Sequence, residues 1–232
     1  MTDREPRSAA RSGVEAPAEP RSTAEVWACL ALAVLGLGGF AVLTWAVVSR
    51  IAIPFDQSTL DLARSWSAFS GVWELLSNAA NIPMIFVGVG LVLWLFWKGA
   101  RREAVLVIVT LALVTAGSEA VKQLVHRPRP PGSDTVVPGV IYSFPSGHVL
   151  EAVTILGIVA VLVWRSSQPL RVRVVVAVAI AVFVALVAVA RVAINAHYPS
   201  DVLAGFLAGI GVLAIFILLT RAPRGGHPQP SR

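Results

Sequence analysis

Charged side chains are scarce in this sequence, where Asp, Glu, Lys and Arg together make up 14% of 232 residues. A soluble globular domain carries about 25% charged and about 45–50% apolar residues. Here 56% of the residues are apolar, and the mean hydropathy is +0.75. This balance excludes an ordinary soluble domain and indicates a membrane protein.

Cysteine is almost missing as well, since Cys29 is the single one. One cysteine excludes disulfide bonds within the chain and cysteine-based metal sites. The net charge of +6 is the other compositional feature. In so apolar a chain a basic balance is typical of membrane orientation, and we therefore expect no nucleic-acid partner.

Long apolar runs are what the sequence has instead. They form six blocks nearly free of charge, at residues 26–48, 82–97, 104–117, 149–164, 174–190 and 202–219. A transmembrane helix needs about 20 residues, within a range of about 17–25. Several blocks reach this length only together with polar neighbours. The sequence therefore predicts an all-α membrane protein with six transmembrane helices, some of which carry polar residues at their ends.

Two polar segments without aromatic residues flank these blocks, at residues 1–25 and 221–232. Their composition predicts disordered tails around one membrane domain, residues 26–220. The 25 polar residues before the first block are not typical of a cleaved signal peptide. With the N-terminal tail in the cytoplasm, 13 of the 19 Lys and Arg residues lie on that side and six on the other. The positive-inside rule then predicts a plasma or inner membrane protein with both termini cytoplasmic.

Ionisable residues lie near the ends of four predicted helices. They are Glu119 and Lys122 on the third, His148 and Glu151 on the fourth, Arg191 on the fifth, and His197 and Asp201 on the sixth. Because successive helices run in opposite directions, all of them are expected at the extracytoplasmic face. Ionisable residues within membrane segments are costly and are usually kept for function. The pattern predicts one polar site.

Three short motifs describe this site. In KQLVHRPRP, residues 122–130, the lysine ends a helix and the prolines prevent the helix from continuing. In PSGH, residues 145–148, Ser146 is a natural N-cap and Gly147 allows a ligand close to the backbone. Free N–H groups at such a helix start would face an anion. In RVAINAHYPSD, residues 191–201, the aspartate lies four residues after the histidine, within reach of its ring.

These residue types favour phosphate chemistry. Lys122, Arg129 and Arg191 can neutralise an oxyanion that carries several charges. A histidine beside a carboxylate suits a nucleophile or general base, and a second histidine suits a general acid. Two His and one Asp are also zinc-ligand types, but three nearby cations would oppose a divalent ion. We expect no metal and no other cofactor.

The spacing Lys-x6-Arg-Pro, Pro-Ser-Gly-His and Arg-x5-His-x3-Asp resembles the type-2 phosphatidic acid phosphatase family. This family includes lipid phosphate phosphatases and bacterial polyprenyl diphosphate and phosphatidylglycerophosphate phosphatases. It shares a helical core with vanadium haloperoxidases. The matching residues are Lys122, Arg129, Pro130, Pro145, Ser146, Gly147, His148, Arg191, His197 and Asp201. One position differs, because Ala190 precedes Arg191 where the family usually has serine.

The resemblance implies a haloperoxidase-like helical core and a two-step phosphatase reaction. His197 would attack phosphorus and form a phosphohistidine, oriented by Asp201, and His148 would act as general acid and then as base. Phosphate oxygens would be held by Lys122, Arg129, Ser146, Gly147 and Arg191.

The implied substrate is a lipid phosphate that stays among membrane lipids and is met at the extracytoplasmic face. Undecaprenyl-type diphosphate, phosphatidylglycerophosphate and phosphatidic acid all fit, and the sequence does not indicate an oligomeric state. The alternatives are a lipid-phosphate transferase, a haloperoxidase, and a non-enzymatic lipid-binding or transport protein.

Four residues outside the motif positions carry lesser expectations. His126 and Arg127 match no motif position, so we predict that they are solvated or at the substrate rim. Glu119 and Glu151 are expected to pair with cations or with a histidine of the site.

Two further segments have patterns of their own. Gly205-x3-Gly209 predicts close packing within the protein. Between the first two spans, Leu62, Ala63, Trp66 and Phe69 would share one face of an interfacial helix, with a plain loop as the alternative.

Overall fold

The computed structural model describes residues 23–80, 82–131, 133 and 142–220. These residues form eight α-helices and one 3₁₀ turn, with no strand among them. The elements are α1 (Thr23–Val48), α2 (Pro54–Arg64), η1 (Ser67–Phe69), α3 (Ser70–Ala79), α4 (Ile82–Trp97), α5 (Arg101–Val125), α6 (Gly147–Trp164), α7 (Leu170–Ala193) and α8 (Pro199–Thr220).

Six helical segments are long and apolar enough to cross a membrane. Five of them are α1, α5, α6, α7 and α8, and the sixth is Ser70–Trp97, which combines α3 and α4 across residue 81. The prediction of six spans is confirmed. The helices that match the predicted apolar blocks all extend beyond them except α4, so Glu119 and Lys122 lie within α5 itself. The predicted tails lie outside the described residues, except that residues 23–25 belong to α1.

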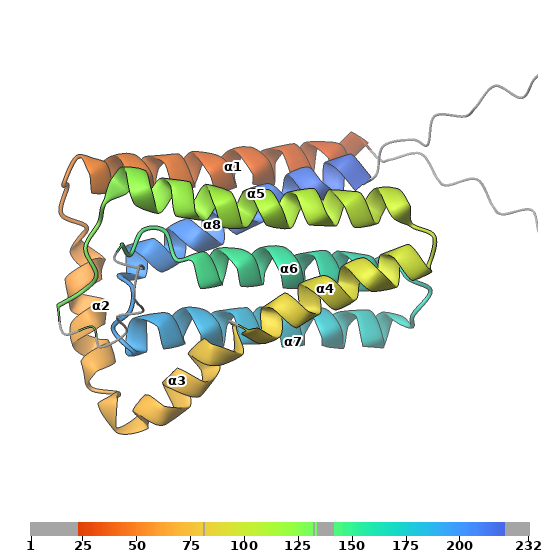
Figure 1. Cartoon of the computed structure of the whole chain (residues 1–232). Helices are drawn as coiled ribbons and strands as arrows, with labels where there is room; N and C mark the ends of the chain where they lie inside the picture. The colour runs from red at the N-terminus through yellow and green to blue at the C-terminus, as the bar shows by residue number, and fades with distance from the viewer. Residues whose placement is uncertain (1–22, 81, 132, 134–141, 221–232) are drawn as a thin grey trace, which may run out of the picture.

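The spanning helices lie side by side, and α2 crosses one end of the bundle (Figure 1). The centre is occupied by α6, half of whose apolar window is buried, against 6% for α1. One core cluster joins α6 to α7 through Val149, Val153, Val184 and Val187. The exposed apolar side chains of the outer helices suit lipid contact.

Two glycines allow α8 to approach α6 closely. A Cβ atom at Gly205 would lie 2.5 Å from the carbonyl oxygen of Ser146, and one at Gly209 would lie 2.8 Å from Val153 Cβ. The predicted close packing within the protein is therefore confirmed. It places the start of α6 against the first turns of α8.

The segment between the first two spans is helical, as predicted, but its faces differ from the prediction. Leu62 and Phe69 are 55% and 62% exposed, whereas Ala63 is buried and Trp66 packs beside it. The prediction that these four side chains share one helical face is therefore wrong. The buried side of α2 also carries Asp56, which is held by Ser200 in the first turn of α8 and by Arg127 in the loop after α5.

Candidate active site

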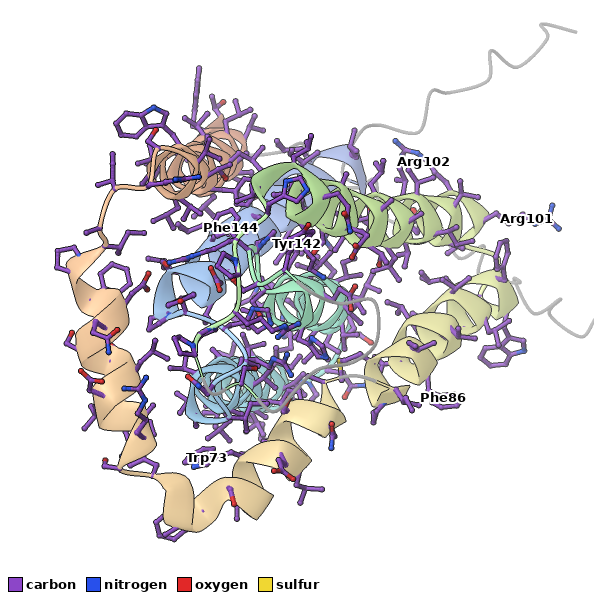
Figure 2. All side chains as sticks on the ribbon, turned by 60° about the vertical axis from the view of Figure 1, so that its left-hand side comes forward. Trp73, Phe86, Arg101, Arg102, Tyr142 and Phe144 are labelled. Carbon is purple, nitrogen blue, oxygen red and sulfur yellow. The ribbon has the colours of Figure 1, made fainter. Side chains whose placement is uncertain are left out.

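The three sequence motifs meet at the end of the bundle that α2 crosses, which is turned toward the reader in Figure 2. The amide of Ser146 donates to the carbonyl of Asp201 (3.0 Å), joining the starts of α6 and α8. The amide of Ser143 donates to the carbonyl of Arg127 (2.9 Å), joining the loop after α5 to the segment before α6. Phe144 in that segment is fully buried and stacks on Phe40 of α1, with the ring centroids 6.0 Å apart. The predicted convergence is therefore present in the structure.

His197 is 2% exposed and lies in the turn between α7 and α8. Its Nδ1 is 2.7 Å from the carbonyl oxygen of Ser143. Because a carbonyl can only accept, the proton of the neutral ring lies on Nδ1, and Nε2 keeps its lone pair. Burial lowers the pKa of His197 to about 4, with Arg191 and Arg129 acting in the same direction and Asp201 opposing them. The imidazole is therefore neutral at physiological pH, as a nucleophile requires.

Asp201 lies farther from this ring than the sequence predicted. Its Oδ2 is 3.7 Å from Nδ1 of His197, whereas the Ser143 carbonyl is a full ångström closer. The carboxylate instead accepts from the amide of Tyr198 (2.9 Å) and from the guanidinium of Arg127. Asp201 therefore lies near enough to influence His197 by its negative charge, and it stabilises the turn through the amide of Tyr198.

The predicted cations surround the two histidines. His148 lies within electrostatic reach of Arg191, His197, Lys122 and Arg129. Burial also lowers the pKa of Arg129, and the negative charge of Asp201 opposes this lowering. The guanidinium of Arg129 donates to the carbonyl of Ala196 (2.7 Å), next to His197 in the chain. Together, Lys122, Arg129 and Arg191 carry enough positive charge to bind an anion with several negative charges.

Arg191 is buried, and its Nη1 donates to the hydroxyl of Ser77 on α3. The sequence indicated a missing hydroxyl here, because Ala190 replaces the family's serine. The structure supplies one from another helix. No sequence pattern indicated this contact, because Ser77 lies 114 positions from Arg191.

Several buried polar atoms at the site have no partner, among them Ser118 Oγ, Ser146 Oγ and Arg191 Nε. Ser146 is the N-cap residue of α6, as predicted, but its hydroxyl makes no capping bond. A Cβ at Gly147 would lie 3.2 Å from Ser118 Oγ and 3.6 Å from Lys122 Nζ. Buried polar groups are nearly always hydrogen-bonded, so these orphaned groups indicate a place for a polar ligand.

Sequence reasoning missed Ser118, although a signal existed. It lies four residues before Lys122 on α5, and residues at this spacing share one face of a helix. The predicted pairing of Glu119 with Lys122 is present, with a distance of 3.4 Å. Glu151 instead accepts from the hydroxyl of Thr115 (3.1 Å).

The prediction for Arg127 was wrong. Its side chain is 15% exposed and forms ion pairs with Asp56 and Asp201. His126 does lie at the surface, where its ring meets Tyr142 edge-on at 4.6 Å. An arginine and an aspartate 71 positions apart give no pattern that a sequence reading can recognise.

Metal-ligand types do not cluster here. Within residues 23–80, 82–131, 133 and 142–220, no group of three or more His, Cys, Asp or Glu could hold a metal ion. The expected metal independence stays a prediction.

Comparisons with known proteins agree with this architecture. The sequence profile of the PAP2 superfamily matches residues 103–224. Phosphatidylglycerophosphatase B of Bacillus subtilis (strain 168) is 24% identical over 173 residues, which cover 74% of this chain and 79% of that protein.

Two solved structures share the fold. One is the transmembrane PAP2-type phosphatidylglycerolphosphate phosphatase from Bacillus subtilis, with a TM-score of 0.66 and 18% identity over 83% of this chain and 100% of that one. The other is LpxE of Aquifex aeolicus, with a TM-score of 0.54 and 20% identity over 71% of this chain and 95% of that one. Together these matches confirm the predicted fold class and the family resemblance. This multi-pass membrane protein belongs to the PAP2 superfamily, which the sequence motifs had indicated as type-2 phosphatidic acid phosphatases.

Proposed function

We propose that this protein is a membrane phosphatase that hydrolyses a phosphate monoester or diphosphate of a lipid. The observation that carries the proposal is the meeting of two histidines and three cations at one end of an apolar bundle. Phosphoryl transfer depends chiefly on positioning and on charge stabilisation, and this site offers both. The related phosphatidylglycerophosphatase B supports the same class of substrate.

The reaction proceeds in two steps. Nε2 of His197 attacks phosphorus while the bond to the lipid oxygen breaks, and protonated His148 gives its proton to that oxygen. His148 then takes a proton from water, whose oxygen attacks phosphorus and breaks the bond to His197. Free phosphate leaves and both rings return to their starting state.

The remaining site groups hold the phosphoryl oxygens. Lys122, Arg129 and Arg191 balance their charge, and the hydroxyl of Ser146 and the amide of Gly147 donate to them at the start of α6. The N-terminus of a helix favours an anion, because its first N–H groups lack partners within the helix. Groups already in place need no reorganisation during the reaction.

Apolar grooves on two sides of α5 support a lipid substrate. A groove of about 330 Å³ between α1, α5 and α8 reaches from Leu219 to Ser118 and Pro145 at the site. A second, of about 430 Å³, lies between α4, α5 and α6 and includes Glu151. A chain held in either groove would place its head group near the histidines while the tail stays in the membrane.

The direct test is phosphate release by the purified protein in detergent. Phosphatidylglycerophosphate, phosphatidic acid and undecaprenyl diphosphate should be compared, because all three present similar head groups and different tails. Release from at least one lipid is expected. Transfer of phosphate to a second lipid would indicate a transferase, and binding without any release would indicate a lipid-binding or transport protein.

Activity should survive metal chelation, because Lys122, Arg129 and Arg191 supply the positive charge that a metal would otherwise give. Phosphate release is therefore expected to be unchanged in EDTA. The check is the same assay with and without chelator, followed by addition of a divalent ion. Loss of activity in EDTA that the ion restores would contradict this expectation.

We further propose that the site faces the extracytoplasmic side. The proposal rests on 13 of the 19 Lys and Arg residues lying toward the opposite side when both termini are cytoplasmic. In Figure 1 the start of α1 and the end of α8 lie at the end of the bundle away from α2.

Cysteine labelling tests this orientation. In a Cys29→Ala background, Ser58→Cys on the exposed side of α2 should react with a membrane-impermeant thiol reagent in intact cells. Ser167→Cys, exposed between α6 and α7, should react only after the membrane is opened. The reverse pattern would place the site in the cytoplasm and leave the chemistry unchanged.

A further inference from the structure

A buried carboxylate ties the crossing helix α2 to the turn that carries His197. Asp56 is 6% exposed and accepts from both the amide (2.8 Å) and the hydroxyl (2.7 Å) of Ser200 at the start of α8. It also accepts from Nη2 of Arg127 (2.7 Å). Neither Asp56 nor Arg127 belongs to the phosphate-binding groups described above.

Arg127 connects this carboxylate to both acceptors beside Nδ1 of His197. Its Nη1 donates to Asp201 and to the hydroxyl of Ser200 (2.7 Å). Its own backbone carbonyl accepts from the amide of Ser143, whose carbonyl in turn faces Nδ1 at 2.7 Å. One residue therefore positions the Asp201 carboxylate with its side chain and the Ser143 carbonyl with its backbone.

The guanidinium is itself held on several sides. Its central carbon lies 4.1 Å from the centroid of the Tyr198 ring. Its nitrogens form ion pairs with Asp56 and Asp201. A planar fork of donors can serve two carboxylates at once, which a lysine ammonium cannot do with the same geometry. Removing one member of such a buried group leaves a charge without compensation.

We propose that Asp56 and Arg127 are a positioning pair for the nucleophile. They keep the Ser143 carbonyl and the Asp201 carboxylate in place around Nδ1, which fixes the proton on Nδ1 and leaves the lone pair of Nε2 for the attack on phosphorus. This inference rests on the proposed function, because it assigns the pair a role in that reaction. Neither residue touches the reacting atoms.

The kinetic test compares Asp56→Asn, Arg127→Lys and Arg127→Gln with a matched control. Asp61→Asn also removes a carboxylate from α2 and an ion pair with an arginine, Arg64 at 2.6 Å, but this pair is exposed. We expect Asp56→Asn to lower kcat by ~10- to 100-fold with little change in KM, the scale of loss when an outer hydrogen-bond partner that orients a metal-binding histidine is removed. Arg127→Lys should retain more activity than Arg127→Gln, and Asp61→Asn should match the unchanged protein.

A second measurement does not depend on activity. The chain has four histidines, so nitrogen NMR of ¹⁵N-histidine-labelled protein in detergent can resolve the ring of His197, with His197→Gln for its assignment. The unchanged protein should show the tautomer protonated on Nδ1. Asp56→Asn and Arg127→Gln should show a mixture of the two neutral tautomers.

The outcomes separate this inference from the proposed function. A fixed tautomer that becomes mixed in the variants supports the positioning pair, even if no lipid phosphate is hydrolysed. A tautomer that stays on Nδ1 in every folded variant would overturn it, as would an equal loss of kcat in Asp61→Asn. If Asp56→Asn fails to fold, Arg127→Lys carries the comparison, because it keeps the positive charge between the two carboxylates.

Discussion

Replacing His197 by alanine should reduce phosphate release by at least ~10³-fold, the scale expected when a catalytic nucleophile is removed. The reason is that phosphorus loses its acceptor, while the cations around the site still bind the substrate. Affinity for the substrate should therefore change far less than kcat. The measurement is steady-state phosphate release together with binding of a lipid phosphate to the purified protein.

His197→Gln is the matched variant, because the ring is 2% exposed and its Nδ1 faces the carbonyl of Ser143. A glutamine amide can still donate to that carbonyl, so the turn should keep its shape while the nucleophile is lost. Both variants should be equally inactive, and His197→Gln should have the higher melting temperature. Near-normal release from either one would rule out attack by His197.

Covalent labelling tests the intermediate. With ³²P-labelled substrate and rapid acid-free quenching, the unchanged protein and His148→Asn should carry radioactivity on histidine, and His197→Gln should carry none. His148→Asn should hold its label longer, because the base that activates water is missing. Label retained in His197→Gln would place the phosphoryl group on another residue.

The fold and most of the site could be predicted because their signals are local in sequence. Apolar runs of helix length gave the six spans, and the polar ends of these runs gave the convergence of Lys122, His148 and Arg191. Chain alternation across a membrane then leaves little freedom in where those ends lie. The family resemblance added the expected roles of these residues.

The supporting contacts could not be predicted, because they join residues far apart in sequence. Ser77 meets Arg191 across 114 positions, and Asp56 meets Ser200 across 144. The same limit explains the error for Arg127, whose position before a proline in a polar loop is typical of a solvated side chain. Its burial depends on α2, and α2 comes from an unrelated part of the chain.

The distance between Asp201 and His197 shows a subtler limit. A spacing of four residues places two side chains on one helical face only where the chain is helical. His197 precedes α8, which begins at Pro199, so its ring is directed by the turn and reaches the Ser143 carbonyl first. Motif spacing indicated Asp201 as the neighbour of His197, but it gave no sign of the Ser143 carbonyl, which lies closer to the ring.

Gly205→Ala should lower activity by about 10²-fold, the loss that a displacement of about 1 Å at a catalytic group can cause. The new Cβ would lie 2.5 Å from the carbonyl oxygen of Ser146 and 3.3 Å from the amide of Leu150. Both are backbone atoms of the first turn of α6, where that carbonyl accepts from that amide at 3.1 Å. Because no side chain can rotate away, the turn that carries His148 has to move.

Gly90→Ala is the matched control, since a Cβ at Gly90 on α4 meets nothing within 4 Å. Alanine there should leave activity unchanged and stabilise the helix by about 0.5–1 kcal/mol, whereas overpacking at Gly205 should destabilise the protein by about 1–3 kcal/mol. Phosphate release and melting temperature of the two variants in detergent measure both effects. Full activity in Gly205→Ala would show that the first turn of α6 tolerates displacement, and would contradict a catalytic role that depends on the exact placement of His148.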